Sequence, residues 1–462
     1  MTPTDTLITG LADYAHGIGI SDVPAQVRRQ AALCILDTVG CMVAGLQDES
    51  WRAIDLVERK RSGLAEATVV GLGQRLCVEG AARLNAYLGD LFELNDLIGG
   101  HASIGVVSAM LALAESLDAP ASALVEAVLV GNEVTARVYM GYYPAIKPYT
   151  ETGMCPVTFP SSLGVAAGAA KLLGLTAHQM AHAMAIAGGL ASWCPSEVIY
   201  GGGGSFKPML HGSCPAESGL RGAWYAQQGM TGPLRLLESE IGYFATAARR
   251  SFPANVLDRE TWYVGAPRRK WHAACGYTHS AIDTVVALRQ QGHPVDRAHR
   301  IRIEVPPYTL PGVSKTAPPS SPNVARFHLQ YCVALAVHGA DTILPAHSLE
   351  FEQHLRRPEL VATMAAIEVA GNPELSHYHQ CRVELLDQDA QVLVRLDGSG
   401  PRGTPQNPLS DEEVVEKFVR MVAPQALSRE QAITYARGFA DLESQPDWRW
   451  IVESFAGAGA RA

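Results

Sequence analysis

The chain has 462 residues, of which 47% are hydrophobic and 18% charged, and its formal net charge is −9 at pH 7. This length exceeds that of a typical single domain, and the composition is globular, so we expect two domains with large cores. An acidic chain without a basic stripe argues against nucleic acid as a partner. A local cluster of cations can still bind a small anionic substrate.

The first 257 residues have the pattern of a helical domain. Small and apolar residues recur at helical spacing, and glycines and prolines mark the breaks. The many alanines and glycines allow close helix packing. The helical segments predicted in this way are residues 27–45, 104–117, 121–139, 162–173, 177–191 and 215–228.

After Pro267 the pattern becomes α/β. Residues 301–305, 382–386 and 391–396 alternate as strands do, and a short polar turn joins the last two into a predicted β-hairpin. Helical segments are expected at residues 280–290, 329–337, 410–422 and 428–442, and Ser410 opens the third of these with a capping-box pattern.

These elements predict a mainly α protein with two domains. Residues 1–266 and 401–462 would form a large all-helical domain, and residues 267–400 would be inserted in it as a smaller α/β lid domain.

The sequence also indicates where in the cell the protein is located. The N-terminus lacks a basic region followed by an unbroken apolar run, so no signal peptide is expected. The longest apolar stretches are interrupted by Lys171, His178 and His182, which favours buried helices over membrane spans. The nine cysteines occur singly, without a CxxC pair, as is typical of reduced thiols. We expect a cytoplasmic protein without membrane contact.

Nucleotide and hydrolase motifs are incomplete. A glycine run at residues 201–204 precedes Lys207, but the GxxxxGK[ST] order of a phosphate loop is absent. We therefore expect a flexible turn that presents Lys207. The chain contains no GxSxG elbow, so a hydrolase triad has no anchor.

Two histidine patterns could suggest a metal site. His178 and His182 lie one helical turn apart, but Gln179 stands where an HExxH motif has glutamate, which favours a pair on the helix surface. A second set alternates and could share one face of a strand, with metal binding as an open alternative: His377, His379 and Cys381.

The remaining candidates are polar residues that lie beside glycines or after a strand. In chain order they are Glu93, Asn95, Asp96 and His101; Lys207 and His211; Arg268, Arg269, Lys270, His272, Tyr277, Thr278 and His279; and Tyr308 after the strand at residues 301–305.

Taken together, these segments resemble the MmgE/PrpD family, which includes 2-methylcitrate dehydratase, cis-aconitate decarboxylase and iminodisuccinate epimerase. Residues 36–40 (LDTVG) look like its N-terminal helix signature. Residues 93–103 (ELNDLIGGHAS) look like its acidic stretch with the following His-Pro-Ser. Residues 270–283 (KWHAACGYTHSAID) resemble its K-x-x-P-x-C-x-x-T-H-x-x-I-D region. The order and spacing of the motifs carry the resemblance.

The resemblance implies a homodimer with its active site in the cleft between the helical and lid domains, and with neither a metal nor an organic cofactor. Asn95, Asp96, His101, Lys270 and Tyr308 match positions implicated in the decarboxylase. Lys207 matches the family's second lysine. The expected catalytic residues are His101, Lys207, Lys270, Tyr308, Cys155 and Asp96. The expected substrate-binding residues are Asn95, His272, His279 and Arg269.

Three positions depart from the family pattern. Leu97 stands where the family often has threonine, and Ala102 stands where proline follows the histidine. Most important, Cys155 replaces the histidine of the family's G-F-H-P segment. This replacement leaves the reaction type open.

The family's reactions share a change of charge at a carbon next to a carboxylate, which requires a proton donor or acceptor and cations for the developing negative charge. Lys207, Lys270 and His101 suit this task, and burial can lower a lysine pKa enough for it to act as a base. Tyr308 could protonate a leaving hydroxyl, Asp96 could orient His101, and Cys155 could exchange protons.

We therefore expect a cofactor-independent lyase that dehydrates a citrate-like or substituted-succinate polycarboxylate. Three alternatives stay open: an epimerase with bases on both faces of the carbon, a cis-aconitate-type decarboxylase, and a polycarboxylate-binding protein that has lost the chemistry.

Overall fold

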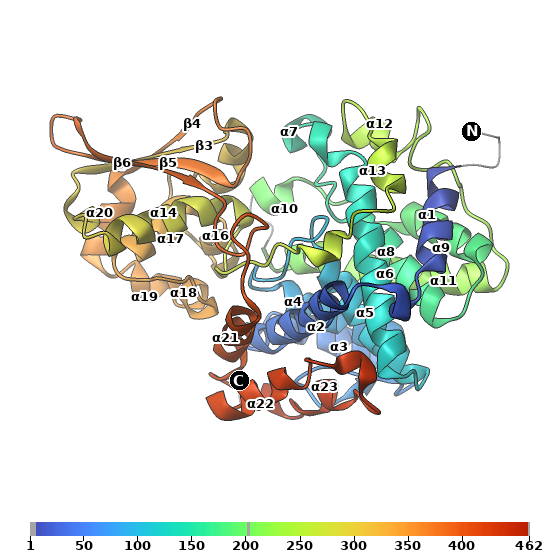
Figure 1. Ribbon diagram of the computed structural model, residues 1–462. Helices are drawn as coiled ribbons and strands as arrows, with labels where there is room; N and C mark the ends of the chain where they lie inside the picture. Colours follow the sequence, from blue (N-terminus) through green and yellow to red (C-terminus); the bar gives the residue numbers. More distant parts are fainter. Residues whose placement is uncertain (1–5, 201–203, 461–462) are drawn as a thin grey trace.

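The computed structural model describes residues 6–200 and 204–460, which are mostly helical and form a large helical domain with a smaller α/β domain beside it (Figure 1). The fold is therefore mainly α with an inserted α/β lid, as predicted. The predicted glycine-rich turn at residues 201–204 falls almost entirely outside the described residues.

The long helices at the centre of the helical domain are α2 (Ala25–Gly45), α4 (Val78–Asp90), α5 (Ala102–Ser116), α6 (Ala121–Met140), α8 (Phe159–Leu172), α9 (Ala177–Leu190) and α11 (Cys214–Gln227). Around them lie α1 (Leu7–Gly17), α3 (Trp51–Arg61), α7 (Tyr149–Thr152), α10 (Glu197–Tyr200), α12 (Tyr243–Ala247), α13 (Pro253–Leu257) and the short strands β1 (Ala67–Thr68) and β2 (Arg75–Leu76). Among the residues described, no helix is both long and apolar enough to cross a membrane.

Small residues let the central helices pack closely. A Cβ at Gly164 in α8 would overlap the hydroxyl of Thr135 and the carbonyl of Gly131 in α6. A Cβ at Gly45 in α2 would overlap the Leu88 carbonyl in α4. The glycines of these segments therefore set helix spacing.

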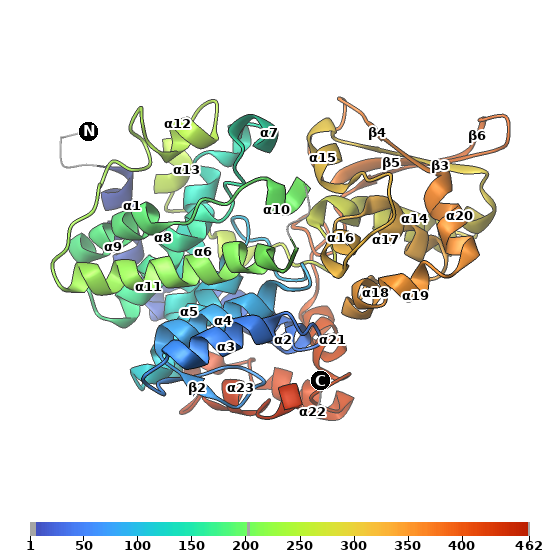
Figure 2. The same cartoon turned by 180° about the vertical axis from the view of Figure 1, so that it is seen from behind.

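The C-terminal helices return to the helical domain, as Figures 1 and 2 show. They are α21 (Asp411–Val422), α22 (Arg429–Arg437) and α23 (Trp450–Glu453). The predicted capping box at Ser410 is confirmed, since its hydroxyl accepts a bond from the Glu413 N–H. Helix α21 packs on α2, and Lys417 of α21 pairs with Asp37 of α2 at 2.7 Å.

The lid contains a four-stranded sheet in the order β4-β3-β5-β6. Its strands are β3 (Arg300–Val305), β4 (Ile367–Gly371), β5 (Gln380–Leu386) and β6 (Val392–Ser399). Strand β3 pairs parallel with β4 and antiparallel with β5, and β5 and β6 form the predicted hairpin. The lid helices are α14 (His279–Gln290), α15 (Leu310–Val313), α16 (Pro322–Arg326), α17 (Leu329–Val337), α18 (Pro345–Leu349), α19 (Phe351–His354) and α20 (Pro358–Ala366).

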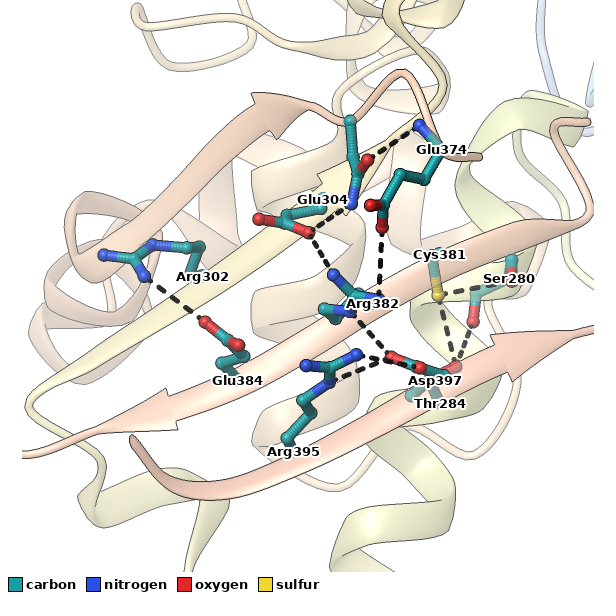
Figure 3. A network of polar contacts seen from close by, with 11 residues as sticks. Ser280, Thr284, Arg302, Glu304, Glu374, Cys381, Arg382, Glu384, Arg395 and Asp397 are labelled. Atoms are coloured by element: carbon teal, nitrogen blue, oxygen red, sulfur yellow. Dashed lines mark hydrogen bonds and ion pairs between the residues drawn. The ribbon is translucent and has the colours of Figure 1, made fainter. Parts of the chain in front are cut away.

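The two faces of this sheet differ in chemistry. Ile301, Ile303 and Val383 are buried beneath the helices. The opposite face carries ion pairs, including Arg382 with Asp397 at 2.9 Å (Figure 3). This alternation is typical of an antiparallel sheet with one solvated face.

Two apolar cores underlie this arrangement. The first joins buried residues between positions 7 and 273 with others between positions 414 and 458. The second is made mainly of residues between positions 274 and 385. The boundaries at residues 266 and 400 themselves stay a prediction.

Several elements were not predicted. Helices α1, α3 and α4 and strand β4 were not among the segments predicted from the sequence. Strand β4 lies at the sheet edge, and only Ile367 of its five residues is buried, so its alternation is weak. It is specified by pairing with β3 rather than by its own sequence.

Gly164→Ala should lower the free energy of unfolding by about 1–3 kcal/mol, because the added methyl has no room between α6 and α8. Gly189→Ala in α9 is the matched control, since its Cβ would meet no neighbouring atom within 4 Å, and it should be neutral or stabilising. Chemical denaturation measures both. Equal effects would contradict the packing argument.

Candidate active site

A cavity of about 490 Å³ lies between the helical domain and the lid. The helical domain contributes Glu93, His101 and His211 to its lining. The segment between α13 and α14, which leads into the lid, contributes Arg268 and Lys270. Two charged side chains, two imidazoles and a guanidinium thus converge on one hollow, the kind of place where ligands bind.

Beneath this cavity lies a buried charge cluster of Asp90, Glu93, Lys207 and Lys270, each at most 3% exposed. The Lys207 ammonium pairs with Asp90 at 2.6 Å and with the Glu93 carboxylate. The Lys270 ammonium pairs with the other oxygen of Glu93. Two cations and two anions therefore compensate one another away from water.

The local backbone places this cluster. Asp90 ends α4, and the following loop carries Glu93 with φ = +55°, a conformation that residues with side chains rarely adopt. Strain of this kind gathers at functional sites. The same loop turns through Gly99 and Gly100, both at positive φ, where a Cβ would meet the backbone of Ala136 or Val157.

The environment of each charged group shifts its proton affinity differently. Burial lowers the pKa of Lys270, although Glu93 opposes this shift. Burial acts in the same direction on Lys207, but Asp90 and Glu93 outweigh it and raise the pKa of Lys207. Burial opposes ionisation of Glu93, yet Lys207 and Lys270 bring the pKa of Glu93 well below its usual value. Lys270 is therefore the lysine whose proton is more weakly held.

His101 is held as a neutral imidazole with a defined tautomer. The Asn95 amide nitrogen donates to its Nδ1 at 2.8 Å and to the Asp96 carbonyl at 2.8 Å. Since Nδ1 accepts, the ring proton resides on Nε2. Burial, with His211 next, lowers the pKa of His101 well below its usual value. His101 thus offers an N–H donor to the cavity.

His211 is the second imidazole of the site. It lies in a π-helical turn, Met209–Ser213, which leads into α11. π-Helical turns are rare in proteins, but those that occur are often found at functional sites. The ring is 4.8 Å from that of His101, and among the described residues neither of its nitrogens has a hydrogen-bond partner. The ring nitrogens of His211 therefore have unused hydrogen-bonding capacity toward a ligand.

Cys155 lies behind the cavity. It is 1% exposed, and its N–H donates to the Cys194 carbonyl at 2.8 Å. Burial raises the pKa of the Cys155 thiol. It is not among the described residues that line the cavity, so the thiol does not face a ligand there.

Two groups of side chains have ligand atoms close enough to hold a metal ion. One is Asp90, His101 and His211, and the other is Cys155, Cys194 and His211. Within each group these atoms lie within 4.8 Å of one another. The thiolate and imidazole donors of the second group would suit a soft or borderline cation such as Zn²⁺.

Asp96 and Tyr308 are near the site without lining the cavity. Asp96 is buried, and burial raises its pKa to about 6. It is Asn95, not Asp96, that contacts His101. Tyr308 accepts the Tyr378 N–H at 2.9 Å and is 38% exposed.

Three residues predicted to bind substrate make contacts within the protein instead. Arg269 donates to the Gln30 side chain at 2.6 Å and to Cys34. His272 pairs with Asp283 at 2.8 Å, and His279 donates to a backbone carbonyl at 3.1 Å. The structure does not bring Arg269, His272 or His279 to the cavity lining.

Arg268 takes the place that Arg269 was expected to hold. It lines the cavity, stacks over the Tyr378 ring at 4.5 Å, and has a buried Nη1 without a partner among the described residues. His211 and Arg268 were both among the polar candidates, but adjacent basic residues point in different directions, and a sequence pattern in a loop does not say which one faces the cavity.

The structure also places the residues of the other two histidine patterns. His178 is exposed, but His182 is buried and accepts the Gly232 N–H at 3.2 Å, so the prediction of a pair on the helix surface is wrong for His182. His377 and His379 line the cavity, but the Cys381 thiol contacts Ser280 and Thr284 beneath the sheet (Figure 3). His377 and His379 lie in the turn before β5, so the predicted sharing of one strand face with Cys381 is wrong.

Comparison with known proteins gives consistent matches. The model of the MmgE/PrpD N-terminal domain matches residues 9–253, and that of the MmgE/PrpD C-terminal domain matches residues 272–437. A cis-aconitate decarboxylase-like protein of Aspergillus oryzae is 25% identical over 99% of this chain and 98% of its own. Cis-aconitate decarboxylases of Mus musculus and Homo sapiens are 26% and 25% identical, over 94% and 95% of this chain and 90% and 92% of their own.

Lys207→Met should destabilise the protein by about 3–5 kcal/mol, because it leaves two buried carboxylates facing one remaining lysine. The control is Arg52→Met, which breaks an exposed pair with Glu49 and should cost less than about 1 kcal/mol. Denaturant titration measures both. Adding Asp90→Asn to Lys207→Met should recover part of the loss, and no recovery would contradict the compensation described above.

Proposed function

Because the chain belongs to the MmgE/PrpD family, we propose that it is a lyase that dehydrates a citrate-like or substituted-succinate polycarboxylate. One observation carries the proposal: the ring centres of two imidazoles lie 4.8 Å apart at a cavity that also holds Lys270. His101 offers an N–H donor, and the ring nitrogens of His211 have no hydrogen-bond partner among the described residues. Elimination of water needs a base at one carbon and a hydrogen-bond donor at the neighbouring hydroxyl, and this pair supplies both.

The anionic substrate is held by cations at the cavity wall. The Arg268 guanidinium has an unpartnered buried N–H, which is costly unless a ligand accepts from it. The Lys270 ammonium lies beside the imidazoles and is paired on one side with Glu93. A substrate carboxylate at Lys270 would place the adjacent carbon at the histidines.

The proposed proton transfer uses both histidines. A nitrogen of His211 removes the proton from the carbon next to the carboxylate, and Lys270 stabilises the negative charge that develops on the carboxylate oxygens. The electron pair then forms the carbon–carbon double bond as the neighbouring hydroxyl leaves. The proton taken up by His211 passes to that hydroxyl, to which the His101 Nε2–H donates a hydrogen bond, so the products are the unsaturated acid and water and His211 returns to its starting state.

Decarboxylation is the second candidate, because the curated relatives are named cis-aconitate decarboxylases. In that reaction a carboxylate leaves as carbon dioxide, and the Lys270 ammonium, which lines the cavity, would give a proton to the carbon that keeps the electron pair. An epimerase with Cys155 as a second base has less support, since that thiol is buried behind the cavity.

Incubation of the purified protein with 2-methylcitrate, citrate and cis-aconitate in deuterated water separates these reactions. We expect 2-methylcitrate and citrate to lose water, and NMR of the products detects this loss. Carbon dioxide release from cis-aconitate would instead favour the decarboxylase. A ligand-induced rise in melting temperature without turnover or deuterium uptake would indicate a binding protein and contradict the proposal.

The two histidine roles predict different partial reactions. His211→Asn should lower both elimination and deuterium exchange by about 10²–10⁴-fold, because the base is lost. His101→Asn should lower elimination but retain deuterium exchange at the carbon, because proton removal does not need the hydrogen bond to the leaving hydroxyl. Loss of exchange in His101→Asn with retention in His211→Asn would reverse the assignment.

Arg268→Gln should raise KM by about 10- to 100-fold, since a hydrogen bond between charged groups contributes about 1.5–3 kcal/mol, with little change in melting temperature. Arg269→Gln is the matched neighbour. Its bonds to Gln30 and Cys34 are internal, so it should lower the melting temperature and leave KM almost unchanged. The opposite pattern would return Arg269 to the binding role.

A further inference from the structure

Most of the cavity wall is apolar or aromatic, which the proposed chemistry at His101, His211 and Lys270 does not explain. The tyrosines of this wall come from both domains. They are Tyr139, Tyr143, Tyr149, Tyr263, Tyr277 and Tyr378. Apolar side chains fill the spaces among them, and they include Leu97, Ile98, Met140, Val157, Ile199 and Phe327.

The tyrosines form ring pairs in both domains. The rings of Tyr139 and Tyr143 stack at 4.3 Å in the helical domain, and those of Tyr277 and Tyr378 meet at 5.3 Å in the lid. Burial raises the pKa of Tyr139 well above its usual value, and the neighbouring Tyr143 and Tyr378 add to this shift. The Tyr139 hydroxyl therefore stays neutral.

The charged groups are gathered elsewhere on the wall. Glu93 and Lys270 are joined to each other, and Lys207 behind them completes their pairing. Arg268 lies at the border, stacked over Tyr378. His377 and His379 also face the cavity, but burial lowers the pKa of both, so neither adds a cation at neutral pH. The cavity thus has a charged part and a tyrosine-lined part.

The volume indicates a ligand larger than a six-carbon polycarboxylate. A cavity of about 490 Å³ falls within the range of about 300–1,000 Å³ that is typical of sites for drug-sized molecules. A small polycarboxylate bound at Lys270 and Arg268 would leave the tyrosine-lined part in contact with water. Covering such a wall with an apolar group removes that surface from water and is favourable.

We propose that the substrate is a polycarboxylate that bears an apolar substituent, an alkyl chain or an aryl group, and that this substituent occupies the tyrosine-lined part of the cavity. The inference rests on the proposed function for the position of the carboxylate head. It adds that the part of the substrate beyond the carboxylate head is apolar. Leu97 and the tyrosines determine the specificity for this apolar substituent.

Binding to the unmodified protein tests the inference without requiring turnover. Isothermal titration calorimetry with succinate, butylsuccinate and hexylsuccinate should show affinity rising about fourfold per methylene, the value for burial of one such group, until the cavity is filled. Hexylsuccinate that binds no more tightly than succinate would overturn the inference.

A variant that fills the cavity supplies the structural control. Leu97→Trp should reduce the preference for hexylsuccinate over succinate at least tenfold, because the indole would occupy the apolar part. Leu393→Trp changes a residue that is 61% exposed on β6 and should leave the preference unchanged. An unaltered preference in a folded Leu97→Trp protein would contradict the placement of the substituent.

The turnover of citrates that carry a methyl, butyl or hexyl group separates this inference from the proposed function. We expect kcat/KM to rise with chain length. Turnover of all three at equal kcat/KM would overturn the apolar substituent and keep the lyase. Tighter binding of hexylsuccinate without turnover of any citrate would overturn the lyase and keep the apolar site.

Discussion

The pairing of two buried lysines with two buried carboxylates is the constraint on which the site depends. Asp90, Glu93, Lys207 and Lys270 are almost fully excluded from water, where an isolated charge would be very costly. Their mutual compensation makes the burial tolerable, and it also requires that three distant segments meet at one place. Glu93 adopts its uncommon backbone conformation where it bridges both lysines.

This cluster couples the fold to the chemistry. Lys270 comes from the segment that leads into the lid, so its bond to Glu93 ties the lid to the helical domain at the cavity. Lys207 precedes the π-helical turn that carries His211. The loop after Asp90 also carries Asn95, which sets the tautomer of His101. Movement of any one segment would therefore change the charge pairing and the positions of both histidines together.

The cavity combines two kinds of surface that have different tasks. The cations and imidazoles occupy one part, where they can bind carboxylates and transfer protons. The tyrosines of the helical domain and the lid occupy the other, where they offer a large apolar area with few conformational degrees of freedom. Binding energy from the second part can be used to position the reacting carbon at the first.

The sequence by itself determined the helices and strands with clear periodicity, the capping box at Ser410, the β5–β6 hairpin and the family. It also singled out His101 and Lys270, which line the cavity. Only the tertiary structure decided that Arg268 rather than Arg269 faces the cavity, that Cys155 lies behind it, and that β4 joins the sheet. The physical reason is distance along the chain. Periodicity reports which face of an element is buried, but Lys270 and Arg269 find their partners 177 and 239 positions away, and local pattern carries no information about such pairings.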